Sequence, residues 1–137
     1  MGQQQLLLII LGVIIVGIAV SVAITIFNDN LISSNRDQIQ NDLLFIASKA
    51  QEFYATPASR AGGGHSFSGI TADATGIKKL VSQEFIDNNN GTYSVRSAGS
   101  STTVQFQGVG KVQLPDGSYP TYTCRVRTYS FSIRKRN

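Results

Sequence analysis

The sequence contains one cysteine, one histidine and no tryptophan among its 137 residues, with no charge before Asp29 and no proline before Pro57. A single cysteine excludes an internal disulfide and any metal site built from several cysteines. The histidine, His65, lies in a glycine-rich stretch, and no serine or carboxylate can be placed beside it from the sequence. The eight carboxylates are scattered without a paired motif. We therefore predict a protein that is not an enzyme and has no cofactor or metal site.

The segment Leu6 to Phe27 is strongly apolar, because 18 of its 22 positions carry apolar side chains and none is charged. As a helix it measures about 33 Å, enough to cross a bilayer core. It is apolar on every side, so lipid or other apolar helices must surround it. A secretory signal peptide is disfavoured, because residues 1–5 lack lysine and arginine and the apolar run is long.

The helical pattern continues beyond Phe27 with one apolar face. No glycine or proline occurs between Asn28 and Tyr54, and the apolar positions recur at spacings of three, four or seven: Ile32, Ile39, Leu43, Ile46, Ala50 and Phe53. This is the period of an amphipathic helix. Thr56-Pro57 ends it, because proline disfavours helical geometry at the preceding residue. We predict one helix from about Gln3 to about Ala55, roughly 80 Å long.

The remaining residues predict a small β-rich head. Gly62-Gly63-Gly64 lacks a following Gly-Lys-Ser/Thr, which favours a flexible turn over a phosphate loop. One short helix is expected at Ile77, Leu80, Val81 and Phe85, followed by a turn at residues 88–91. Alternation then indicates four or five antiparallel strands; these contain Tyr93 and Val95, Val104 and Phe106, Val112 and Leu114, Tyr122, Cys124 and Val126, and Tyr129, Phe131 and Ile133. A phase change near Thr128 indicates a bulge or a break between strands, and Cys124 is expected to be buried.

The predicted fold class is therefore α+β, a long N-terminal helix with a small C-terminal antiparallel sheet. Its parts are an apolar helix (1–27), an amphipathic continuation (28–56), a glycine-rich connection (57–76) and a globular head with one short helix (77–137).

A polar start, the run from Gln5 through Val20, an amphipathic helix to Phe53 and a C-terminal β domain together resemble a type IV pilin or pseudopilin. The resemblance implies a prepilin peptidase that cleaves after a glycine and methylates the new amino terminus. It also implies an inner-membrane pool and an assembly machinery that extrudes subunits into a filament. The family's glutamate at the fifth mature position is absent. Gln5 stands there if Met1 is the mature start, and Leu7 if Gln3 is. The family's proline is also absent, at Val22. These departures are typical of a divergent bacterial branch or of archaeal pilins.

Two sets of residues follow as candidates for filament contacts. The apolar helix is expected to pack against copies of itself through Leu6, Ile10, Gly12, Val13, Gly17, Val20, Ile24 and Phe27. Gln5 is the expected contact with the amino terminus of a neighbouring subunit. Its amide can hydrogen-bond but cannot form the ion pair that glutamate would.

Charge distinguishes the two halves. Residues 1–54 carry two basic and four acidic residues, whereas residues 55–137 carry ten basic and four acidic. Five basic residues lie near the end of the chain, and they form a candidate surface for DNA or acidic partners: Arg125, Arg127, Arg134, Lys135 and Arg136. The alternative is that they solubilise the head or pair with acidic residues of neighbouring subunits. Asn90-Gly91-Thr92 is also a glycosylation sequon, which makes Asn90 a candidate for modification.

The sequence thus predicts a structural subunit of an extracellular, type IV pilus-like filament with a membrane-inserted precursor. The alternative is a monomeric, single-pass membrane-anchored binding domain.

Overall fold

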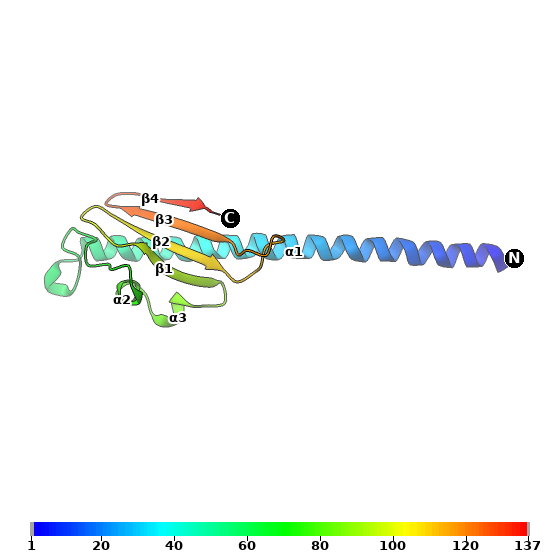
Figure 1. The fold of residues 1–137 in the computed structure, drawn as a ribbon, viewed down its shortest axis with the longest axis horizontal. Helices are drawn as coiled ribbons and strands as arrows, with labels where there is room; N and C mark the ends of the chain where they lie inside the picture. The colour runs from blue at the N-terminus through cyan, green and yellow to red at the C-terminus, as the bar shows by residue number, and fades with distance from the viewer. Residues whose placement is uncertain (1, 137) are drawn as a thin grey trace.

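The computed structural model describes residues 2–136 and has one helix far longer than any other element (Figure 1). Helix α1 spans Gly2–Ala55, 54 residues without interruption, which corresponds to about 80 Å. Its N-terminal half projects freely from the head, and its C-terminal half lies along the sheet (Figure 1). The predicted continuous helix and the α+β fold class are both confirmed.

The sheet has four antiparallel strands in the order β1-β2-β3-β4, so each strand pairs with its neighbours in sequence. The strands are β1 (Gly91–Ser97), β2 (Thr103–Gly110), β3 (Thr121–Arg127) and β4 (Phe131–Lys135). The pairing of β1 with β2 shifts between Val95 and Ser97, a bulge that the sequence did not indicate. The predicted break near Thr128 is the turn between β3 and β4, closed by the Arg127 amide donating to the Ser130 carbonyl at 2.7 Å.

The core forms where the amphipathic half of α1 meets one face of the sheet. Ile39, Leu43, Ile46 and Ala50 are fully buried, as the helical spacing predicts. They pack in one cluster with the inward side chains of the strands, which are Tyr93, Val95, Val104, Phe106, Tyr122, Cys124 and Val126. The predicted burial of Cys124 is confirmed. Gly108 and Gly110 let α1 approach the sheet closely, because a Cβ at Gly108 would lie 2.8 Å from Ile39 Cγ2.

Three local expectations are wrong. The short helix is two helices, α2 (Ala74–Lys78) and α3 (Gln83–Ile86), because Ser82 takes the extended conformation that precedes a new helix start. Val112 and Leu114 lie in a loop rather than a strand; the Leu114 amide donates to Ser118 O at 2.8 Å, closing the turn at Pro115. Tyr129 lies in the turn before β4 and is 96% exposed.

The glycine-rich connection is an ordered cap on the C-terminal end of α1 rather than a flexible turn. It begins with a short 3-10 helix, η1 (Ala58–Arg60). The amides of Gly63, Gly64 and His65 then donate to the carbonyls of Phe53, Thr56 and Tyr54 at 2.7, 3.0 and 2.8 Å. These carbonyls belong to the last turn of the helix and its exit, which have no partners within the helix. A Cβ at Gly63 would lie 2.1 Å from the Ser66 carbonyl oxygen, so only glycine fits.

Candidate assembly helix and arginine face

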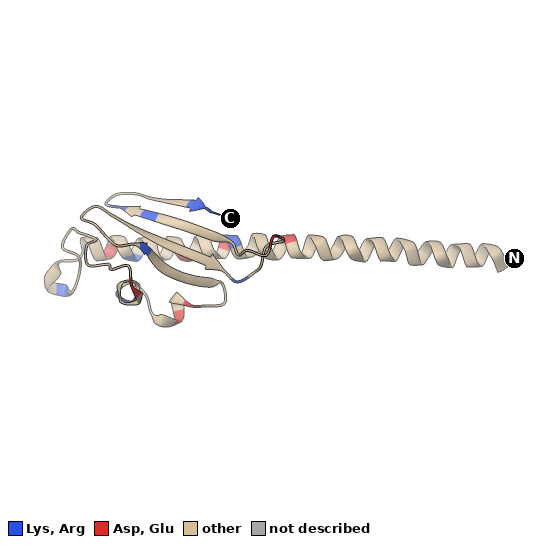
Figure 2. Ribbon diagram, in the orientation of Figure 1, with Lys and Arg blue, Asp and Glu red and all other residues tan. Residues whose placement is uncertain are grey.

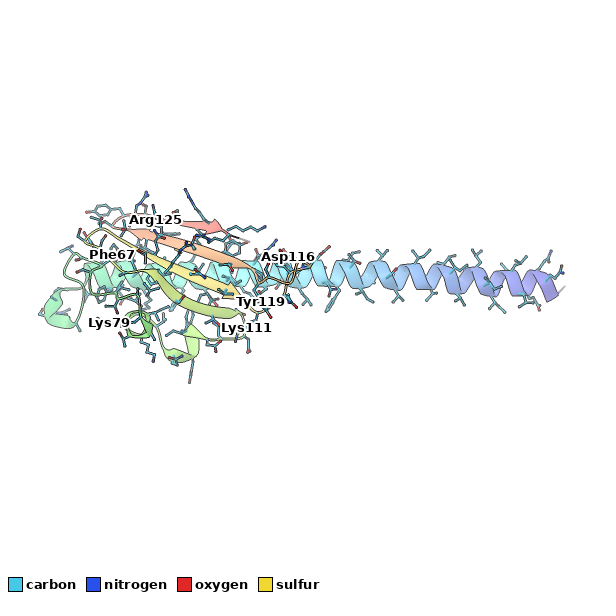
Figure 3. All side chains as sticks on the ribbon, in the orientation of Figure 1. Phe67, Lys79, Lys111, Asp116, Tyr119 and Arg125 are labelled. Carbon is cyan, nitrogen blue, oxygen red and sulfur yellow. The ribbon has the colours of Figure 1, made fainter. Side chains whose placement is uncertain are left out.

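The free half of α1 presents apolar side chains on every side (Figure 3). From Leu6 to Phe27, each large apolar side chain is between 51% and 68% exposed. No charged residue occurs on this half of the helix, whereas the charged residues lie on the head and on the C-terminal half of α1 (Figure 2). By its length and composition, the segment is long and apolar enough to cross a membrane. The head does not contact these apolar side chains, so another surface, of lipid or of protein, must shield them from water.

Seven of the eight predicted packing positions share one stripe along this half. Their spacing alternates between four and three residues, which keeps side chains on one helix face: Leu6, Ile10, Val13, Gly17, Val20, Ile24 and Phe27. Gly12 lies on another face. A Cβ added at Gly12 or Gly17 would meet nothing within 4 Å, so both glycines leave open hollows in the helix surface. Such hollows allow close approach of a neighbouring helix.

The predicted N-terminal contact lies at the start of this helix. Gln5 is the fourth residue of the helix and is exposed, and Gln3, one candidate mature start, is also helical. Met1, the other candidate, lies outside the described residues. The choice between the two starts stays a prediction.

A polar cluster fixes the C-terminal half of α1 to the head. Asp42 Oδ2 accepts hydrogen bonds from Tyr93 Oη at 2.6 Å, Asn88 Nδ2 at 3.1 Å and Asn90 Nδ2 at 3.1 Å. About two turns toward the N-terminus from this contact, Asn35 Nδ2 donates to the Asn90 carbonyl at 2.7 Å. Tyr93 is 1% exposed, and burial, with the bond to Asp42, raises the pKa of its hydroxyl. The amphipathic period provided no signal for these contacts, because Asn35 and Asp42 are polar positions on the face that meets the sheet.

The sequon lies inside this cluster. The turn predicted at residues 88–91 is present, with Asn88 Oδ1 accepting from the amides of Asn90 and Gly91 at 2.8 and 3.1 Å. Asn90 Nδ2, the atom that would carry a sugar, donates to Asp42. That nitrogen therefore already has a partner in the folded head.

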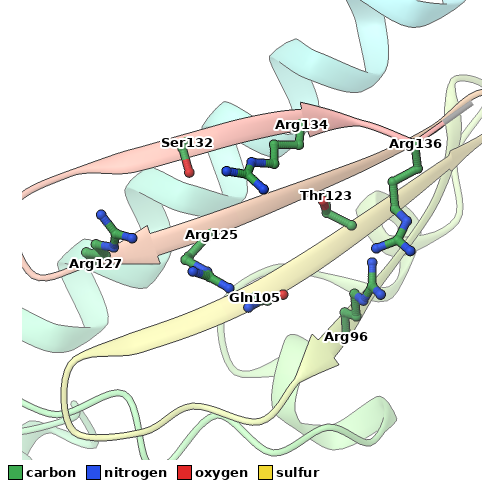
Figure 4. Close-up of a pocket in the computed structure, with 8 residues that line it drawn as sticks. All are labelled: Arg96, Gln105, Thr123, Arg125, Arg127, Ser132, Arg134 and Arg136. Carbon is green, nitrogen blue, oxygen red and sulfur yellow. The ribbon is translucent and has the colours of Figure 1, made fainter.

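The outer face of the sheet, away from α1, carries a groove of about 270 Å³ that is dominated by arginine (Figure 4). We call it the arginine face. Its lining residues are Arg96, Gln105, Thr123, Arg125, Arg127, Ser132, Arg134 and Arg136. Five of the eight are arginines, and among the described residues that line it none is acidic.

The arginine face revises the predicted basic surface at two positions. Lys135 pairs across the sheet with Tyr122, whose side chain is buried toward α1, so Lys135 lies on the opposite face from the four arginines. Arg96, which the sequence analysis missed, joins them from β1. It is the extra residue at the bulge between Val95 and Ser97. The sequence did contain a signal for Arg96. It alternates in step with Ser94 and out of step with Tyr93 and Val95, which places it on the outer face of the strand.

The remaining candidate reactive groups, His65 and Cys124, lie outside the arginine face and the polar cluster. His65 is exposed and makes an edge contact with the ring of Tyr54, with centroids 5.5 Å apart. Burial raises the pKa of the Cys124 thiol to about 11. Across residues 2–136, no group of three or more His, Cys, Asp or Glu side chains is placed to hold a metal ion.

No family model, curated protein or solved structure matches this chain.

Proposed function

We propose that this protein is a structural subunit that polymerises through α1 into a type IV pilus-like extracellular filament, after residence in a membrane. The observation that supports it is the exposed, charge-free half of α1 and its unbroken continuation into the helix that carries the head. Burying each leucine or isoleucine side chain contributes about 1.5–3 kcal/mol, so this half must be covered by lipid or by other helices.

Three features favour helices as the final cover. On its C-terminal side the apolar run is followed by a single basic residue, Arg36, within about 20 residues, so the charge that orients a helix in a bilayer is small on that side. The open hollows at Gly12 and Gly17 suit helix-to-helix contact. The head is joined through a continuous helix rather than a flexible linker, so its direction relative to the helix axis is fixed. Regular, non-closing contacts between such units generate a helical polymer.

The alternative function, a monomeric membrane-anchored domain, uses the same helix without close contacts between copies. Electron microscopy of sheared surface material, with mass spectrometry of its amino terminus, separates the two. A filament that contains this chain with a methylated Met1 or Gln3 supports the proposal. Recovery only from detergent-solubilised membranes, as single copies, rejects it.

A substitution at Gly17 tests helix contact directly. Gly17→Leu raises the hydropathy of the segment, so membrane insertion should be unchanged, but its side chain fills the hollow on the packing stripe. We expect filament yield to fall at least tenfold at equal membrane abundance. Ile14→Leu, which conserves side-chain volume, is the matched control and should leave the yield unchanged. A Gly17→Leu chain that assembles as well as the control would contradict close packing at this stripe.

A further inference from the structure

We propose that the arginine face binds the phosphate backbone of double-stranded DNA. The first argument is charge without a counter-charge. The ion pairs found among residues 2–136 are Lys49 with Glu52 and Lys111 with Asp87, and neither involves this face. Figure 4 shows the guanidinium groups of Arg96 and Arg136 pointing toward one another across the groove. No acidic side chain occurs among the described residues that line the groove, and two facing cations are stabilised when an anion lies between them.

The second argument is the kind of side chain present. Every cation of the face is arginine, whose planar group donates in pairs to phosphate oxygens. The other lining residues are Gln105, Thr123 and Ser132, and amide and hydroxyl side chains also donate to phosphates in protein–DNA contacts. Gln105, with its amide turned to accept, bonds Arg125 Nη2 at 2.7 Å and Nε at 3.0 Å, which fixes that guanidinium in place.

The third argument is the absence of aromatic side chains among the described residues that line the face. Proteins that bind single strands stack successive bases on aromatic rings, with positive grooves for the backbone. The arginine face provides the positive groove and no stacking surface. It therefore suits a duplex, whose bases are already stacked and whose phosphates face outward.

The fourth argument is spacing. Across the sheet Arg134 is paired with Thr123, and Arg125 with Ser132, so no arginine of β3 lies directly opposite one of β4. Arg125 and Arg134 are diagonal neighbours, a relationship that separates residues by about 7–8 Å. The face extends over four strands, about 14 Å at the usual strand separation. Along one DNA strand phosphates advance about 3.4 Å each along the axis while turning about it by roughly a tenth of a turn, so a flat face of this width lies against about two or three of them.

The arginine face does not depend on polymerisation, so its test uses the full chain as a monomer in neutral detergent. The probe is a fluorescent 20-base-pair DNA duplex, and its affinity is measured from 50 to 300 mM NaCl. The variant is Arg96→Gln with Arg134→Gln and Arg136→Gln. The matched control, with the same change in net charge off the face, is Arg60→Gln with Lys78→Gln and Lys135→Gln.

If the three arginines contact phosphates, their loss removes about three contacts, so the slope of log K against log salt becomes shallower by about 3. At 100 mM salt the affinity falls on the order of 100-fold, whereas the control set loses less than a third of that slope change. The corresponding Arg→Lys triple variant keeps the charges and should retain the slope. Circular dichroism and the unfolding midpoint establish that each variant is folded.

Four results would overturn the proposal. The first two are no measurable binding of the duplex by the native chain at 50 mM salt, and an equal loss of duplex affinity in the control variant. The other two are tighter binding than the duplex by an oligo-dT strand of equal phosphate number, or by an acidic polysaccharide such as polygalacturonate. The last would identify a carboxylate polymer as the ligand instead. None of these results bears on whether the chain forms filaments.

Discussion

Replacing Asp42 by alanine should loosen the head from α1 more than any other single polar substitution on the helix. Asp42 Oδ2 accepts bonds from one buried hydroxyl and two amide groups. A hydrogen bond to a charged group contributes about 1.5–3 kcal/mol, and leaving the buried Tyr93 hydroxyl without a partner costs about 1–3 kcal/mol. Since these terms overlap, we expect the free energy of unfolding to fall by about 3 kcal/mol.

The change is measurable through tyrosine fluorescence, because the chain has no tryptophan. For a head of this size, 3 kcal/mol lowers the unfolding midpoint by about 12–24 °C. Asp37→Ala is the matched control, an exposed carboxylate on the same helix, and it should change stability by less than about 0.5 kcal/mol.

A double-mutant cycle isolates the bond between Asp42 and Tyr93. Tyr93→Phe keeps the buried ring and removes only the hydroxyl, so when Asp42→Ala is added to the Tyr93→Phe variant it should cost at least about 1 kcal/mol less than in the native chain. Strictly additive effects, or an Asp42→Ala variant as stable as the Asp37→Ala control, would refute the assignment of this cluster as the contact that fixes α1.

Three further substitutions or titrations test other parts of the fold. Gly110→Ala would place a Cβ 2.2 Å from Asn35 Oδ1, and this overpacking should lower the free energy of unfolding, measured by urea titration, by about 1–3 kcal/mol; an unchanged free energy of unfolding would contradict the close approach. Burial raises the Cys124 pKa to about 11, so alkylation by iodoacetamide at pH 8 should be at least about 100-fold slower in the folded chain than in urea, and equal rates would show that the thiol is accessible. Bonds from Thr71, Thr75 and the Gly76 amide lower the Asp73 pKa to about 2; its contribution to stability is therefore present above about pH 4 and lost as the pH falls toward 2, and a carboxyl NMR titration with a midpoint near 4 would contradict it.

The sequence predicted the elements whose signal is carried by periodicity. The spacing of Ile39, Leu43 and Ile46 indicates the buried face of α1, and the alternation around Tyr93 and Phe106 indicates the inward faces of β1 and β2. Both signals arise from the geometry of the element itself, so they need no knowledge of the partner.

The contacts that join the elements could not be predicted in the same way. Asn35 and Asp42 are polar, and their partners in the turn at residues 88–91 and at the Val112 amide lie 46 to 77 residues away in the sequence. Val112 and Leu114 alternate as a strand would, but no strand among the described residues pairs with them. Their loop lies against α1 instead, where it lines a hollow with Leu31 and Ile32. The arginine face could not be predicted without the strand register, which places Arg96 of β1 on the same face of the sheet as Arg125 of β3, with β2 between them.

The order of the strands also affects how the chain folds while it is being made. The sheet pairs only sequence neighbours, so it closes through short connections, whereas α1 is held by distant bonds such as Asn35 Oδ1 to the Val112 amide, 77 residues apart. At ribosomal rates of about 5–20 residues per second, roughly 4–15 s pass between synthesis of Ala50 and of Val126. During that interval the buried face of α1 has been synthesised and its partner strands have not. Aggregation in this interval therefore depends on what covers the apolar face of the nascent helix. The stability of the finished head does not affect it, because the head has not yet formed.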